Sequence, residues 1–236
     1  MNAQRRTPSR YKTMNRITSL LVQLIGVKRP KPRTRFGRYL RRSERVITCL
    51  LLLYLGLHLF PEVIFAHSLT ERGITLYSRE PLPPEAAACA RRAAELVGHS
   101  ELAVPGSRER VYICNAPWGY RLFGPFSSGA FAFYVPLIDR VFVAVADPSR
   151  DTATRAAREF NSRSVSGVVA HEITHGLIRH RLGLMQSLRL PGWIAEGYCD
   201  YVACESSFPE SDGRCLMAAG ESDPSRSFRY FVSLFC

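Results

Sequence analysis

Fifteen residues without a charge, at positions 46–60, follow an N-terminal segment that is strongly basic. After Pro61 and Glu62 the apolar sequence resumes, so the whole stretch is about 21 residues long, roughly what a bilayer-spanning helix needs. Arginines flank it on one side only, a charge asymmetry that a buried core helix would seldom show and that favours a cytoplasmic N-terminus. The sequence therefore predicts a retained single-pass membrane anchor over residues 46–66, with the following domain outside the cytoplasm.

The positive charge of the chain is confined to its beginning. Residues 1–45 hold 14 Lys and Arg against one acid, whereas the remaining residues hold 18 basic and 19 acidic side chains. A basic arm is also typical of nucleic-acid binding, but this arm leads directly into an apolar segment. We therefore predict a basic cytoplasmic tail over residues 1–45 and no nucleic-acid partner. Prolines mark residues 67–84 as a linker, which leaves residues 85–236 as the folded domain.

The cysteines are compatible with an oxidising compartment. One of the seven lies within the apolar stretch, and the other six follow it: Cys89, Cys114, Cys199, Cys204, Cys215 and Cys236. An even number suggests disulfides, although the sequence does not fix their pairing. The alternative is that these cysteines are reduced and buried in the core. None of them has the C-x-x-C spacing of a thiolate zinc site or a redox motif.

The order of predicted elements is typical of an α+β domain. A helix is expected from Pro84 to Val97, and two later helices are expected from Ser164 or Ser166 to near Gly183 and from about residue 191 past Cys204. The other expected elements are strands at residues 110–114, 130–135 and 140–145, a short helix at 152–160 and a final helix at 228–235.

The first chemical signal is His171-Glu172-Ile173-Thr174-His175 within the helix predicted to end near Gly183. Residues four apart share one face of a helix, so both imidazoles can reach a single metal ion. Glu172 is rotated by about 100° from His171, which places its carboxylate beside the ion, where it can accept a proton from water. The pattern predicts a metal site with Glu172 as general base.

The second signal lies in the next predicted helix. Glu196 follows His175 by 21 residues, enough for a loop and an antiparallel return. Asp200 lies one helical turn after Glu196, where a carboxylate can orient a metal-bound histidine through its second ring nitrogen. We therefore expect Glu196 to be a ligand and Asp200 to contact a ligand histidine.

Together these residues resemble the gluzincin zinc metallopeptidases, in particular the small peptidase MA-like domains. The resemblance implies Zn²⁺ bound by His171, His175 and Glu196, with Glu172 as general base and Asp200 orienting a ligand histidine. It also implies a small zincin-like domain of helix, short sheet, active-site helix and ligand helix, which would follow the predicted N-terminal transmembrane helix. The metzincin pattern is not met, because Ile178 and Arg181 stand where it requires glycine and histidine.

The expected function is a membrane-anchored, zinc-dependent peptidase acting on a peptide or protein substrate. The substrate could add as a strand along Gly129, Ala130 and Phe131, although the same apolar run fits an ordinary core strand. Tyr201 and Tyr230 are the candidates for stabilising the oxyanion. The alternative is a membrane-tethered zinc- or peptide-binding module of zincin fold without catalysis.

Overall fold

The computed structural model describes residues 34–127, 129–155, 162–206, 208 and 210–233. The chain divides into two compact units, Met1–Pro61 and Glu62–Cys236. Most of the predicted cytoplasmic tail and one expected cysteine, Cys236, lie outside the described residues.

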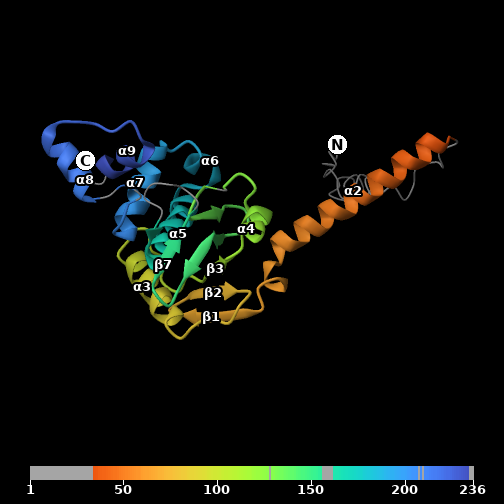
Figure 1. The fold of residues 1–236 in the computed structure, drawn as a ribbon, viewed down its shortest axis with the longest axis horizontal. Helices are drawn as coiled ribbons and strands as arrows, with labels where there is room; N and C mark the ends of the chain where they lie inside the picture. Colours follow the sequence, from red (N-terminus) through yellow and green to blue (C-terminus); the bar gives the residue numbers. More distant parts are fainter. Residues whose placement is uncertain (1–33, 128, 156–161, 207, 209, 234–236) are drawn as a thin grey trace, which may run out of the picture. The chain divides into compact units, whose positions relative to one another are not determined.

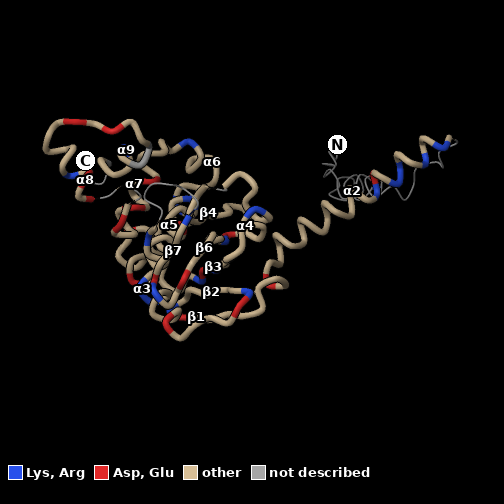
Figure 2. The backbone as a smooth tube through the Cα atoms, viewed as in Figure 1, with Lys and Arg blue, Asp and Glu red and all other residues tan. Residues whose placement is uncertain are grey.

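The described part of the first unit is the helix α2 (Arg35–Leu59). The side chain of Thr34 caps its beginning by accepting a hydrogen bond from the Gly37 amide, and the helix ends just before Pro61, where a proline disfavours helical backbone. Figure 2 shows charged residues along the first part of α2 and none in its later part.

The uncharged part of α2 spans 14 residues, about 21 Å at 1.5 Å per residue, against a hydrocarbon core of about 30 Å. Within the described residues, no helix has both the length and the apolar character needed to cross a membrane. The prediction of a transmembrane anchor over residues 46–66 is therefore wrong, and with it the predicted single-pass membrane location. The 21-residue estimate counted across Pro61, where the helix has already ended.

The later residues of the supposed anchor belong to the second unit. After the 3-10 turn η1 (Pro61–Val63), Phe65 is buried among the aromatic residues of the core. Glu62 accepts a 2.6 Å hydrogen bond from the Tyr112 hydroxyl and pairs with Arg110 and Arg140. Of the apolar sequence that resumes after Glu62, Phe65 is thus buried in a protein core with Ile64 packed against it, whereas Val63 is exposed.

The second unit is an α+β domain around a five-stranded sheet of order β1-β2-β3-β5-β4 (Figure 1). The strands are β1 (His67–Glu71), β2 (Ile74–Ser78), β3 (Glu109–Ile113), β4 (Ala132–Val135) and β5 (Arg140–Val143). The pairs β1/β2 and β4/β5 are antiparallel, and β3 is parallel to both β2 and β5. Residues 67–84, expected to be a linker, therefore contain the first two strands of the sheet.

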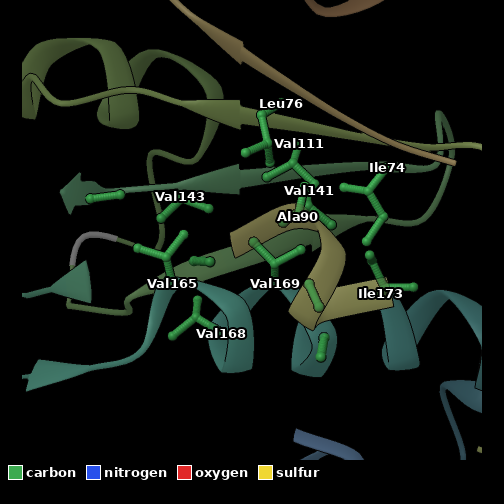
Figure 3. Packing of buried hydrophobic residues seen from close by; sticks show 14 of the residues in the cluster. Ile74, Leu76, Ala90, Val111, Val141, Val143, Val165, Val168, Val169 and Ile173 are labelled. Atoms are coloured by element: carbon green, nitrogen blue, oxygen red, sulfur yellow. The ribbon is translucent and has the colours of Figure 1, made fainter. Parts of the chain in front are cut away.

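The two faces of the sheet carry different cores. Leu76, Val111 and Val141 lie side by side in register on the face that packs against α3 (Ala86–Gly98) and α5 (Val165–Leu182), as Figure 3 shows. Aromatic rings, including those of Tyr112 and Phe142, fill the other face and pack against α4 (Pro117–Phe123). Because both faces are covered, the sheet is a rigid base for α5.

A second sheet contains β6 (Val145–Asp147), β7 (Thr152–Thr154) and β8 (Ser162–Arg163). The strand β7 lies where a short helix was expected over residues 152–160, so that prediction is wrong for its first residues, and residues 156–161 are not described. Ala153 is fully buried between two β-branched threonines, a period-two pattern that fits a strand.

The remaining helices are α6 (Leu184–Ser187), α7 (Gly192–Ala203), α8 (Glu210–Ala219) and α9 (Arg226–Ser233). The predicted helices that begin near residues 84, 164, 191 and 228 are confirmed as α3, α5, α7 and α9. In the described part of the chain, all six cysteines are free, so the expected disulfides are not seen among them.

Candidate metal centre

The helix α5 presents both histidines of the first motif. Its N-cap is Ser164, whose hydroxyl accepts a 2.8 Å hydrogen bond from the Gly167 amide, and its C-cap is Gly183, whose φ of 79° favours glycine. One helical turn separates His171 from His175, and their ring centroids lie 5.0 Å apart. The packed helix thus holds two imidazoles on one face.

Glu196 faces both histidines from α7, which packs against α5. Its Oε2 lies 3.3 Å from His171 Nε2, and its Oε1 lies 3.6 Å from His175 Nε2. A tetrahedral ion with bonds of about 2.1 Å separates its ligand atoms by about 3.4 Å. Each of the two distances from a histidine nitrogen to a Glu196 oxygen is close to that separation.

Asp200 lies on the far side of the His171 ring. It is one turn after Glu196 on α7, is 3% exposed, and places Oδ1 at 2.8 Å from His171 Nδ1. The tautomer with its proton on Nδ1, beside Asp200, leaves Nε2 free to bind an ion. The expected contact between Asp200 and a ligand histidine is present in the structure.

Cys199 is a further member of this group. Its sulfur and a ring nitrogen from each of His171 and His175 all lie within 4.8 Å of one another, and its side chain is fully buried. A buried His171/His175/Cys199 group could therefore hold a metal ion. From the sequence, Cys199 was expected either in a disulfide or reduced in the core; its position three residues after Glu196 on one helix is the signal that could have revealed it.

A cavity of about 410 Å³ opens at this group. Glu172, only 9% exposed, lines it together with His171, His175 and Glu196. The remaining lining is largely apolar and includes Ile178, Leu184 and Leu188. Glu172 thus lies beside His171, His175 and Glu196, but the close contacts to the two histidines are made by Glu196 and not by Glu172.

Without a metal, the electrostatics of the group favour a single proton, carried by His171. Burial opposes the charge of His171, but contacts with Asp200 and Glu196 outweigh it and raise the His171 pKa to about 9. Burial and the neighbouring His171 charge lower the pKa of His175. Burial alone would raise the Glu196 pKa, yet the hydrogen bond from His171 and the nearby histidine charges hold it below its usual value.

This charge distribution predicts that metal binding displaces a proton. Below pH 9 the metal-free His171 is protonated, and an ion can bind only its neutral form, so we expect about one proton released per ion at pH 7. Metal affinity should therefore rise with pH up to about 9 and level off above it, where proton release falls towards zero. Calorimetry in buffers of different ionisation enthalpy measures the proton count.

The control for this prediction is Asp200→Asn, which removes the main contact that raises the His171 pKa and should shift the proton release to lower pH. Release of two protons in the parent, reduced to one by Cys199→Ala, would indicate that the thiol is also a ligand. A metal affinity that does not change between pH 6.5 and 9 would contradict the assignment of His171 as a ligand.

The tyrosines near the cavity differ from those expected. Tyr201 is 64% exposed on α7, and neither it nor Tyr230 of α9 is among the described residues that line the cavity. Tyr134 of β4 does line it, and its hydroxyl accepts a 2.9 Å hydrogen bond from Arg179 Nε. Burial, and to a lesser extent the negative charge of Glu172, raise the pKa of Tyr120 of α4.

The predicted substrate strand is divided between the cavity and the core. Ala130 lines the cavity, as do Ala132, Phe133 and Tyr134, whereas Phe131 is buried in the main core cluster. The described lining does not include Gly129. The strand β4 that follows is the last in its sheet, so one of its edges is not paired within the described sheet.

Compared with protein-family models, curated proteins and solved structures, the chain shows no match. The resemblance to gluzincins accordingly rests on the motif residues alone.

Proposed function

We propose that this protein is a zinc-dependent peptidase of the gluzincin type. The observation that carries the proposal is the Glu196 carboxylate, which lies 3.3 Å from Nε2 of His171 and 3.6 Å from Nε2 of His175. Two imidazoles and one carboxylate are the donors of a catalytic zinc site that keeps a position open for water or substrate. The carboxylate of Glu172 beside them supports a hydrolytic role over simple metal storage.

The residues of the chain divide the chemical work. A bound zinc ion would supply a Lewis acid for the scissile carbonyl and lower the pKa of water. Glu172 accepts the proton of the attacking water and passes it to the leaving amine. Asp200 holds the His171 ring, so that its Nε2 stays directed at the metal position.

The surroundings of the cavity favour a peptide with apolar side chains. Ile178, Leu184 and Leu188 line the same cavity as the metal-binding residues, and burial of an apolar side chain against them is favourable. The open edge of β4 offers backbone groups to an extended peptide. Both features fit a peptide substrate better than a small polar one.

The proposal is tested by measuring metal content and peptide cleavage together. Elemental analysis of the purified full-length chain should find one zinc ion per chain, and a mixture of fluorogenic peptides should be cleaved. Removal of the metal with a chelator should abolish cleavage, and added Zn²⁺ should restore it. A folded chain with zinc at background level would overturn the proposal.

One observation favours a second function, a metal-binding module without catalysis. The sulfur of Cys199 lies within ligand range of both histidines. With Glu196 it would complete four protein ligands, and closed four-ligand sites are structural more often than catalytic. The cavity next to Glu172 is the feature that favours the peptidase.

Cobalt(II) distinguishes these two functions, because a thiolate bound to it gives an intense near-ultraviolet charge-transfer band that imidazole and carboxylate do not give. For the peptidase we expect visible bands of bound cobalt, no sulfur band and active hydrolysis. A sulfur band that Cys199→Ala removes and Cys114→Ala leaves, together with no cleavage, would favour the module. Cys114 is a suitable control because it is equally buried but lies in the aromatic core.

A further inference from the structure

A buried arginine connects the metal centre to the N-terminus of α5, the helix that carries both histidines. Arg163 of β8 has a side chain that is 6% exposed, and its NH2 group lies 3.3 Å from Asp200 Oδ1, the same oxygen that contacts His171 Nδ1. The guanidinium also reaches Glu205, with Nε at 3.3 Å from the side-chain Oε1 and NH2 donating to the backbone oxygen at 3.0 Å. One side chain thus connects Asp200 with Glu205.

Glu205 in turn contacts the N-terminus of α5. The Ser164 amide donates to Glu205 Oε2 at 3.2 Å, and the Ser164 hydroxyl donates to Oε1 at 3.1 Å. A carboxylate at a helix N-terminus is favoured by the unpaired amides and the helix dipole. A Cβ added at Gly167 would meet Glu205 Oε1 at 2.1 Å, so the absence of a side chain at Gly167 permits this approach.

We infer that Arg163 is a positioning residue for the metal centre, which it serves by holding Asp200 against His171 while Glu205 fixes the start of α5. This role rests on the proposed metal site and extends it from the ligands to the residues behind them. Through Glu205, which follows α7, the same arginine is also connected to Ser164 at the N-terminus of α5.

The geometry explains why the residue is an arginine. A planar guanidinium presents several donors in fixed directions and can contact Asp200, the Glu205 side chain and the Glu205 carbonyl at once. A lysine would keep the charge as a single point and lose at least one of these contacts. Charge alone is therefore not expected to preserve the function of this position.

The inference is tested by a double-mutant cycle on metal affinity in the full-length chain. Arg163→Met and Asp200→Asn should each weaken Zn²⁺ binding by about 10- to 100-fold, measured by competition with a chromophoric chelator. The double variant should bind no more than about twofold more weakly than Asp200→Asn alone, because Arg163 acts through Asp200. Arg163→Lys, which retains the charge and is the milder change for folding, should also weaken binding.

The matched control is Arg140→Met. Arg140 is also buried and ion-paired, but its partner is Glu62 of the turn η1, so we expect a lower unfolding temperature with unchanged metal affinity. Parent-like affinity in both Arg163→Lys and Arg163→Met would overturn the inference. So would independent, multiplying losses from Arg163 and Asp200, or an equal loss in Arg140→Met. Failure of the parent to bind any metal would instead overturn the proposed function, and this role with it.

Discussion

Glu172→Gln is expected to reduce peptide hydrolysis by at least about 100-fold while zinc remains bound, because general-base help is typically worth 10²- to 10⁴-fold. Glutamine is nearly isosteric with glutamate, so α5 and the two histidines should keep their positions. Glu172 makes none of the close contacts to His171 and His175 that Glu196 makes, so its loss should leave the metal ligands intact. Initial rates on a fluorogenic peptide, with zinc content measured on the same sample, check the prediction.

Glu95→Gln is the matched control, because Glu95 lies on the surface in an exposed pair with Arg72 and should leave the rate unchanged. Cleavage by Glu172→Gln at the parent rate would show that Glu172 is not the base. A parent chain that holds zinc and cleaves nothing in a broad peptide mixture would give preference to the metal-binding module.

The features of the site that could be predicted from the sequence are those within a single helix. The spacing of His171 and His175, and that of Glu196 and Asp200, fixes which side chains share a face whatever surrounds the helix. The helix caps at Ser164 and Gly183 follow from local chemistry in the same way. The structure brings these four side chains into contact across the two helices.

The residues that sequence analysis missed come from separate parts of the chain. Arg163 reaches Asp200 from a two-residue strand, and Tyr134 reaches the cavity from the edge of the sheet. No periodicity in the sequence connects such positions, because their proximity depends on how the sheet and helices pack. Tyr201 was proposed as a tyrosine downstream of the histidine motif, but on the helix it is largely exposed to solvent.

The incorrect membrane prediction has a different cause. Counting apolar residues across Pro61 treated two separate structural elements as one. The residues before it form the end of α2, whereas Phe65 after it is buried in the core of the second unit. The charge of Glu62 appeared as a brief interruption in sequence, whereas in the fold it pairs with Arg110 and Arg140. A proline followed by a charged residue is better interpreted as a boundary between two elements.

Loss of a metal ligand should have the largest effect on binding. Structural zinc sites are worth about 10–16 kcal/mol for four ligands, or roughly 3 kcal/mol each, so His171→Ala or Glu196→Ala should weaken Zn²⁺ binding by roughly 100- to 1000-fold and leave no metal after purification. His180→Ala is the control on the same helix, since its ring is half exposed and contacts Asp139. It should bind zinc like the parent. Normal zinc content in Glu196→Ala would show that Glu196 is not a metal ligand.

Cys199→Ala completes the comparison, because it separates a site with an open position from one that the protein closes. If zinc is held by His171, His175 and Glu196, removing the thiol should leave zinc content intact, and any effect should be the smaller cost of a buried methyl-sized cavity. If the thiol is the stronger third ligand, Cys199→Ala should lose zinc as fully as His171→Ala, whereas Glu196→Ala should retain it. Because both residues lie on one face of α7, one turn apart, the two variants differ little in helix context, and their zinc contents identify the ligand directly.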